Sequence, residues 1–598
     1  MILFYLNRLR IHQKCVRLLH KAKLSCEHKP SKRSFHSCYT HCNVDTSKSN
    51  NSINEYSSYE HERTNLLTTP STSASLMETI QSEKQNTIHQ IDEMLKMVPG
   101  GVTRSSIQDE IQSASILVPA AEATSIMNAE TGPTGKYEYF FQDSLMLGTR
   151  SYKRRDVASG EEQLVFSINF HLEHLGPMSL SVDESYAVRL INYSSSSSTV
   201  GEEMKQKVII RDISAAVDHD VDIMGVGRFH NVEFGPRLPD MSAGVALHSL
   251  FFTTCNALGR PNAVHGCVVF GDELDHEKKP KSKSKRIHSR PELVLRDDDA
   301  ANFVDVQRTK GCDYVAIHST SKTSNEVHLV GQELAPILVR KRQVGVQYFV
   351  DCGTDDDVII MAHKIGNVEG DLPESLGEEF SVFEERVTNL PLGSSLGTPI
   401  IFGSDGANAN TFIEDMELFE TNIVFYERSF VDGTQRIRTI DRRSGNDRII
   451  PIEGVGVNDG TLVLSAAGNI NYHSPHFEFL VESPVRPPVS LQYDFDTCTV
   501  LSADDGDNTR ELNERSRYKT RRLLVDGEDG TKIPLTIVYD ESVNLSGRRP
   551  VVLVGYGCYG QNQNLAYDPT LRPLVDRGFV IVSIEDRFTL KSSEIIVS

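Results

Sequence analysis

Between residues 136 and 507, short runs of β-branched and aromatic residues recur, and turn residues bound each run. Such runs, with few helical windows between them, predict an all-β architecture of short strands. The span holds about seven units of roughly 50 residues, which suits the blades of a β-propeller. Only the basic run His276–Arg290 has the composition of a linker, and we interpret it as a charged insertion between strands, so we favour a seven-bladed propeller over a string of β-sandwiches. The predicted strands are Tyr137–Gln142, Gln163–Ile168, Tyr186–Asn192, Lys207–Asp212, Leu250–Thr254, Tyr314–His318, Val327–Val330, Val344–Val350, Val358–His363, Asn422–Glu427, Gln435–Asp441 and Thr461–Ala466.

A different pattern begins near residue 515. The apolar run Val551–Val554 leads into a glycine-rich turn, a helical segment follows at Thr570–Arg577, and a second apolar run occupies Phe579–Ile584. Gly578 stands where a helix C-cap prefers glycine. This order predicts a parallel βαβ unit whose strands are buried on both faces. Residues 515–598 are therefore interpreted as the beginning of an α/β domain, since one such unit cannot bury its own faces.

The composition of the N-terminal segment predicts a targeting signal rather than a folded domain. Residues 1–44 carry nine Lys or Arg and one acidic residue, Glu27. The basic residues alternate with apolar ones, a pattern typical of a transit peptide for the mitochondrion or another organelle. An unprocessed cytoplasmic tail is the alternative. Residues 45–76 are rich in Ser, Thr and Asn and are expected to form a disordered linker, and residues 77–135 are expected to be helical.

Composition excludes several classes of protein. The net charge is −20, so the body of the chain is a poor binder of nucleic acid and suits cationic substrates better. No apolar run is long enough to predict a membrane-spanning helix. Ten scattered cysteines do not form a disulfide framework. A His/Cys group at residues 36–42 fits no usual zinc spacing, so neither a metal nor a cofactor is expected.

Five segments, in chain order, resemble the prolyl oligopeptidase family, most closely its oligopeptidase B branch. The absence of Trp is a departure, which indicates a divergent member. Leu175–Leu190 is similar to an early blade with an SPD-like turn, and His248–Asp275 is similar to a blade in which a strand precedes Arg-Pro. Phe303–Val330 is similar to a segment that ends in an SKTSSEVW-like run, and Thr520–Ser542 is similar to the hairpin that re-enters the catalytic domain. Val554–Gly560 (VGYGCYG) is similar to the family's YGYGSYG.

This resemblance implies an α/β-hydrolase serine peptidase whose active site is covered by the propeller, with residues 77–135 packed on the hydrolase domain. Such enzymes cleave short peptides. The oligopeptidase B resemblance implies cleavage after basic residues, and cleavage after proline is the other choice. The resemblance also implies that the Tyr556 hydroxyl donates to the oxyanion of the tetrahedral intermediate, a role worth about 10²–10³ in rate. Simple packing of Tyr556 beneath the propeller is the alternative.

The family's Ser, Asp and His triad has no counterpart in the sequence. One G-x-S-x-G run, Gly393–Gly397, places Ser395 at its centre, but Pro391 and Pro399 flank it and no strand-to-helix elbow is predicted. We interpret it as an inter-strand turn. Two hypotheses follow: a truncated serine oligopeptidase that is inactive as written, or a non-catalytic propeller that binds peptides or a partner protein. Oligomeric state is left open.

Overall fold

The computed structural model describes part of the chain between residues 129 and 584. The chain divides into two compact units, Met1–Arg104 and Ser105–Ser598, and every described residue belongs to the second. The predicted leader, linker and N-terminal helices lie outside the described residues. The described ranges are 129–144, 147–169, 171–193, 205–221, 228–239, 247–270, 288–354, 356–365, 376–377, 379–393, 396–401, 411–429, 433–452, 461–502, 517–526, 532–546, 549–555 and 565–584.

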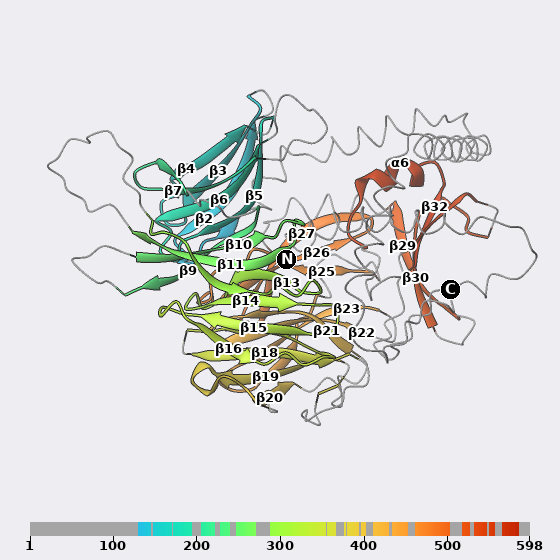
Figure 1. The fold of residues 1–598 in the computed structure, drawn as a ribbon. Coiled ribbons are helices and arrows are strands. Elements are labelled where there is room, and N and C mark those ends of the chain that lie inside the picture. The colour runs from blue at the N-terminus through green and yellow to red at the C-terminus, as the bar shows by residue number, and fades with distance from the viewer. Residues whose placement is uncertain are drawn as a thin grey trace, which may run out of the picture. The chain divides into compact units, whose positions relative to one another are not determined.

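Seven consecutive four-stranded antiparallel sheets account for the described residues up to Ser502 (Figure 1). In each sheet, strands that follow one another in sequence are neighbours. Sheet 1 contains β1 (Glu130–Thr131), β2 (Tyr137–Ser144), β3 (Thr149–Asp156) and β4 (Glu162–Asn169), and sheet 2 contains β5 (Glu173–Leu180), β6 (Tyr186–Tyr193), β7 (Lys205–Asp212) and β8 (Val217–Asp220). Sheet 3 contains β9 (Phe229–Leu238), β10 (Leu247–Cys255), β11 (Pro261–Phe270) and β12 (Glu292–Arg296), and sheet 4 contains β13 (Phe303–Arg308), β14 (Val315–Thr320), β15 (Asn325–Val330) and β16 (Pro336–Arg340).

Sheets 5 to 7 repeat the same arrangement. Sheet 5 contains β17 (Val346–Cys352), β18 (Asp357–Lys364), β19 (Ser381–Arg386) and β20 (Thr398–Ile401), with the short 3-10 helix η2 (Val387–Asn389) between β19 and β20. Sheet 6 contains β21 (Thr411–Leu418), β22 (Asn422–Ser429), β23 (Gln435–Asp441) and β24 (Asp447–Ile449). Sheet 7 contains β25 (Val463–Ala466), β26 (His476–Ser483), β27 (Arg486–Asp494) and β28 (Thr499–Ser502).

Every predicted strand coincides with one of these, and the observed strands are mostly longer by a few residues. The first sheet differs from expectation in one respect. Its first strand, Glu130–Thr131, lies in the segment predicted to be helical and pairs antiparallel with β2. No described strand belongs to two of the seven sheets. Sheets 1 and 7 meet instead at an isolated bridge between Thr131 and Asn469.

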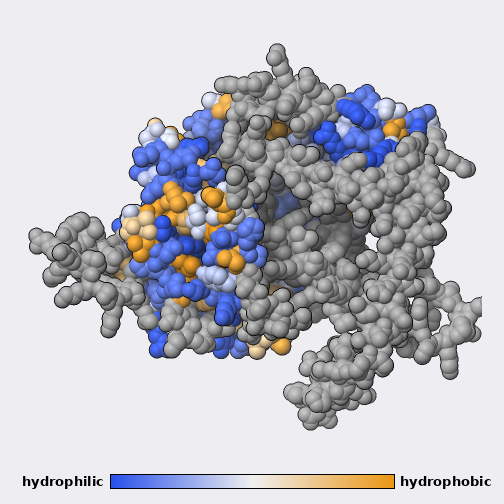
Figure 2. All heavy atoms as spheres, turned by 90° about the horizontal axis from the view of Figure 1, so that it is seen from above, coloured by the Kyte–Doolittle hydropathy of each residue, from blue (hydrophilic) through white to orange (hydrophobic). Residues whose placement is uncertain are grey.

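The hydrophobic core lies between successive sheets. Within the described ranges, six clusters of buried side chains each join one sheet to the next, from sheets 1 and 2 to sheets 6 and 7. Between sheets 2 and 3, for example, Val188 and Leu190 pack with Phe234 and Phe252. The sheets are therefore stacked face to face, and each inner sheet is covered on both sides. Figure 2 shows that the outer surface carries separate orange hydrophobic patches among blue hydrophilic residues.

Sheet 8 has a different topology. It has the order β29 (Tyr518–Asp526), β30 (Lys532–Asp540), β32 (Val580–Ile584) and β31 (Val551–Gly555). β31 and β32 are parallel, and η4 (Pro569–Leu571) and α6 (Arg572–Val575) lie between them in sequence. Gly578 ends this helical segment with a φ of +80°. The predicted βαβ unit is confirmed. No helix in the part of the chain that the structure describes is long and apolar enough to cross a membrane.

The prediction that both strands of the βαβ unit are buried on both faces is wrong for β31. Val551 and Leu553 are 53% and 64% exposed, whereas Val580 and Ile581 in β32 are buried. Among the strands that the structure describes, β31 lies at the edge of sheet 8 and has a neighbour on one side only. Its apolar side chains therefore lack the cover that a strand inside a layered α/β domain has.

A recurrent five-residue turn joins the first strand to the second in sheets 1, 2 and 4. It begins at Gly132, Ser181 and Thr309, and in each case the residue three positions on donates its N–H to the carbonyl of the first. That fourth residue has a left-handed backbone, with φ of +71° at Gly135, +58° at Glu184 and +67° at Cys312. The repeated turn supports the interpretation of the sheets as equivalent units.

We predict that Gly311→Ala destabilises the fold. Gly311 donates its N–H to the Cys352 carbonyl, and a Cβ at position 311 would lie within 2.6 Å of the Gly353 carbonyl oxygen. Because that neighbour is backbone, the strain cannot be relieved by moving a side chain, and a loss of about 1–3 kcal/mol in the free energy of unfolding is expected. Urea denaturation measures it. Gly393→Ala, where an added Cβ meets nothing within 4 Å, is the control.

Candidate functional site

The loop predicted to hold the oxyanion donor begins at the carboxyl end of β31. Gly555, the last residue of β31, lies opposite Ile584, the last residue of β32, so both strands end at one edge of sheet 8. Ligands of open α/β sheets bind at the carboxyl ends of their strands. Tyr556 itself lies outside the described residues, and its role stays a prediction.

The G-x-S-x-G run lies in the connection between η2 and β20 of sheet 5. Ser395 is outside the described residues, but both flanks are described. Leu396 is buried, Gly397 has a φ of +107°, and the Gly393 carbonyl accepts a hydrogen bond from Arg340. The element before the run is a single 3-10 turn and the element after it is a strand. An elbow needs a strand before the serine and a helix after it, so the flanks favour the inter-strand turn.

Sheet 8 contacts sheet 7 through the turn between β26 and β27. Tyr567, just before η4, donates its N–H to Glu482 Oε2 in β26 over 2.8 Å. Burial raises the pKa of the Glu482 carboxyl, and the hydrogen bond from Tyr567 opposes that shift. A small hollow between the two sheets is lined by Pro484, Val485, Tyr518, Val538, Tyr567, Asp568, Leu571, Arg572 and Val575. In an antiparallel meander, the second-to-third turn lies at the end where the first strand begins. Sheet 8 therefore packs at that end.

The start of the helical segment is fixed locally. Asp568 accepts a hydrogen bond from the Thr570 N–H over 2.9 Å and so acts as the N-cap, with Pro569 following it. Tyr518 of β29 donates its hydroxyl to Asp576 over 2.6 Å and accepts from Arg572 over 3.0 Å. These contacts attach the helical segment between β31 and β32 to β29 at the far side of sheet 8.

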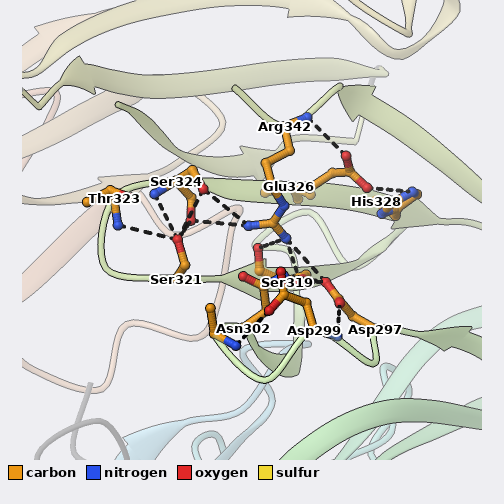
Figure 3. A network of polar contacts seen from close by, with 12 residues as sticks. Asp297, Asp299, Asn302, Ser319, Ser321, Thr323, Ser324, Glu326, His328 and Arg342 are labelled. Carbon is orange, nitrogen blue, oxygen red and sulfur yellow. Dashed lines mark hydrogen bonds and ion pairs between the residues drawn. The ribbon is translucent and has the colours of Figure 1, made fainter. Parts of the chain in front are cut away.

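A polar network around Arg342 holds three connections of sheet 4 together (Figure 3). Its guanidinium donates to Ser319 Oγ over 2.6 Å, to the Ser324 carbonyl over 3.3 Å and to Asp297 over 3.4 Å. Burial would raise the pKa of Asp297, but hydrogen bonds from Ser319 and others and the charge of Arg342 outweigh it and lower the pKa. Part of the network comes from the segment Phe303–Val330, whose sequence carries the family resemblance. Arg342, Ser319 and Asp297 bond to one another, which indicates a structural role, whereas His328 Nδ1 is buried with no hydrogen-bond partner among the described residues.

Carboxylates recur on the first strands of sheets 3 to 6 and form a feature that the sequence did not single out. Burial raises the pKa of Glu233 in β9, and it raises the pKa of Asp351 in β17 and of Asp415 in β21 to about 6. Asp305 in β13 accepts a hydrogen bond from Asn231 over 3.0 Å. In the sequence, each appears as a polar position of an alternating strand, so no local signal marks the series.

Comparison with known proteins gives consistent relatives. No family model matches the chain. A prolyl endopeptidase-like protein of Xenopus laevis is 24% identical over 293 residues, which cover 48% of this chain and 38% of the relative. Protease 2 of Moraxella lacunata is 23% identical over 303 residues, covering 50% and 39%. Oligopeptidase B from Leishmania major superposes with a TM-score of 0.60 at 16% identity over 86% of this chain and 65% of that one.

In sequence and in fold, this chain resembles the prolyl oligopeptidase family. A second solved structure, oligopeptidase B from Trypanosoma brucei, agrees, with a TM-score of 0.57 and 18% identity over 80% of this chain. At these identities the solved structures establish the fold alone, which is a series of four-stranded sheets followed by a sheet with a parallel βαβ unit. The chain spans about two-fifths of the length of the curated relatives it matches.

We predict that Asp351→Asn stabilises the protein at neutral pH and not at acid pH. Because its folded-state pKa, about 6, exceeds its ordinary value of 3.8, folding is penalised once the carboxyl ionises, and the penalty fades as pH falls below 6. A shift of about two units corresponds to about 3 kcal/mol. The gain in unfolding free energy over wild type should therefore grow by up to that amount between pH 4 and pH 7. Asp220→Asn, at an exposed position of β8, should show no such growth.

We predict that Glu482→Ala loosens the attachment of sheet 8 to sheet 7. Removing the carboxylate leaves the Tyr567 N–H without its acceptor, and hydrogen bonds to charged groups are worth about 1.5–3 kcal/mol. Amide exchange at Tyr567, followed by mass spectrometry, should accelerate by about tenfold or more. Glu482→Gln keeps an acceptor oxygen and should exchange close to the wild-type rate. Equal exchange in both variants would contradict the role.

Proposed function

We propose that this chain is part of a serine oligopeptidase that hydrolyses short peptides, with a preference for cleavage after basic residues. The observation that carries the proposal is the chain order of seven meander sheets followed by a parallel βαβ unit, together with relatives that are serine peptidases of one family. The acidic body of the chain and the carboxylates on the first strands support a cationic substrate. Cleavage after proline is the competing specificity.

We further propose that the seven sheets close into a seven-bladed ring, at residues 136–507 with β1 added, and that residues 515–598 begin the peptidase domain. Face-to-face clusters between successive sheets and the bridge between Thr131 and Asn469 support the ring. A closed ring would leave, along its axis, an opening that is at most wide enough for a peptide. Folded proteins would therefore be excluded from the peptidase site that the ring covers. Of the segment 77–135, the part that precedes β1 would pack on the peptidase domain. The basic pattern of residues 1–44 supports delivery to the mitochondrion or another organelle, with a cytoplasmic location as the alternative.

In this proposal the hydroxyl of Tyr556 stabilises the oxyanion of the tetrahedral intermediate. Its position directly after β31, at the carboxyl edge of sheet 8, supports that role. In this proposal the nucleophile, its His base and the orienting Asp are absent from this sequence. We therefore propose that the 598-residue chain alone is inactive. The second candidate function is a non-catalytic propeller that binds peptides or a partner protein. The exposed apolar side chains of β31 support this candidate, because a partner protein could cover them.

The proposal is tested with short fluorogenic peptides that contain either Arg or Pro at the cleavage position. We expect the pure 598-residue chain to turn over neither peptide. A product of a transcript that continues past the codon for Ser598, and that encodes a Ser elbow, Asp and His, should cleave the Arg peptide. In that product, Tyr556→Phe should lower kcat by about 10²–10³ with little change in KM.

Turnover of the Arg peptide by the pure 598-residue chain would contradict the proposed inactivity. A transcript that ends at Ser598, combined with peptide binding without cleavage, would favour the non-catalytic propeller. Preference for the Pro peptide by the longer product would leave the family assignment intact and overturn the proposed specificity.

A further inference from the structure

Lys310 lies in the turn after β13 of sheet 4, and its side chain is only 13% exposed. Its ammonium group contacts the carbonyl oxygen of Asn469 in sheet 7. The same group lies 3.5 Å from Glu417 Oε2 and 4.7 Å from the centre of the Phe419 ring, both from sheet 6 or its first turn. One side chain of sheet 4 therefore reaches sheets 6 and 7.

The groups that receive Lys310 are themselves linked. Asn469 donates its side-chain amide to Glu417 Oε1 over 3.1 Å, and Tyr426 donates its hydroxyl to the same oxygen over 2.9 Å. Asn469 also forms the bridge with Thr131 of sheet 1. The Lys310 contacts therefore continue, through Asn469, to the seam between the first and the last sheet.

Two further contacts join this turn to other sheets. The Lys310 N–H donates to Asp351 Oδ1 of sheet 5 over 2.7 Å. Arg308, the last residue of β13, donates from its guanidinium to the Leu180 carbonyl of sheet 2. Sheet 4 is thus connected from one turn to sheets 2, 5, 6 and 7.

The position of these contacts follows from the topology. β9 packs beside both β5 and β13, so the first strands lie nearest the centre of the stack. In a ring of seven, sheets 4 and 7 lie on opposite sides of the axis, and a side chain that joins them crosses it. Arg308, Lys310 and Asn469 all lie at or just after the end of a first strand. The crossing therefore lies at the end of the axis away from sheet 8.

We propose that Lys310 is a clasp that closes this end of the ring axis. The ring axis rests on the proposed function, whereas the contacts of Lys310 are those given above. A buried ion pair with a purely structural role would, when broken, loosen the protein generally. Loss of a clasp would expose only the groups beside it.

Native thiols report on this difference. Cys312 lies in the same turn and donates its thiol to the Lys310 carbonyl oxygen, and Cys352 follows Asp351 and is fully buried. Burial raises the pKa of both thiols, so both should react slowly while the clasp is closed. Cys267 in β11 is also buried but belongs to the core between sheets 2 and 3. It serves as an internal control for general loosening.

The experiment measures the rate of N-ethylmaleimide labelling at each cysteine of the full chain by peptide mass spectrometry. Lys310→Met, which keeps the length of the side chain and removes its charge, should raise the rates at Cys312 and Cys352 by about tenfold or more and leave Cys267 unchanged. Glu417→Gln should raise them by a smaller factor. Lys207→Met, which breaks an exposed lysine pair with Asp220 in sheet 2, should change none of the three.

Wild-type rates at Cys312 and Cys352 in both Lys310→Met and Glu417→Gln would overturn the clasp. A matching rise at Cys267 would show that the whole protein has loosened and would overturn it as well. If Lys310→Met fails to fold, Glu417→Gln decides by the same criteria. Because labelling requires no catalysis, the clasp can fail while the proposed peptidase function stands, and the reverse is equally measurable.

Discussion

The structure depends on one constraint: a four-stranded sheet of this composition can bury its two faces only against other sheets. β6 shows the consequence, because six consecutive residues from Tyr186 to Ile191 are buried, which is impossible for a strand covered on one face only. Arg189 lies within that run, and its charge is paired with Asp218 over 2.8 Å and stacked on the Phe166 ring. The fourth strands have one neighbour and lie at the outside, and β8 and β24 are correspondingly polar and mostly exposed.

Successive sheets in this stack are also neighbours in sequence, except at the contact between sheet 1 and sheet 7, which we call the seam. No described strand is shared across it, and the contacts there are polar: the bridge between Thr131 and Asn469 and the Lys310 contacts to the same residue. Apolar clusters tolerate small shifts between sheets, whereas a lysine that must meet a carbonyl and a carboxylate fixes their relative positions. Partly buried ion pairs contribute little net stability, so their effect at the seam is better understood as specificity of arrangement.

The sequence predicts what is local and misses what depends on distant neighbours. The strands Asn422–Glu427 and Gln435–Asp441 were placed almost to the residue, because β-branched runs and an Asp-Gly turn carry that information. β1 is two residues long and has no pattern to detect. The contact between Lys310 and Asn469 joins residues 159 positions apart, and nothing in the turn that holds Lys310 marks it as more than a polar connection.

The candidate peptidase site shows the same division. The parallel pair β31 and β32 was predictable from two apolar runs around a glycine-capped helical segment, but the role of Tyr556 came only from the resemblance of its flanking glycines. The apolar runs report the burial that a strand needs, so they predicted the two strands but not which of their side chains would be exposed. The resemblance in turn located no nucleophile, because none of the five segments that carry it contains a candidate for the family's triad.

Sheet 8 therefore distinguishes the two functional hypotheses on physical grounds. Burying an apolar side chain such as Leu553 is worth about 1.5–3 kcal/mol, and an uncovered edge strand with such side chains favours association with other strands. A peptidase product with further strands and helices would supply the cover within one molecule. A non-catalytic propeller must obtain it from a second molecule or bear the tendency to aggregate. The two hypotheses thus differ in where the cover of β31 comes from, which is the same molecule in one case and a second molecule in the other.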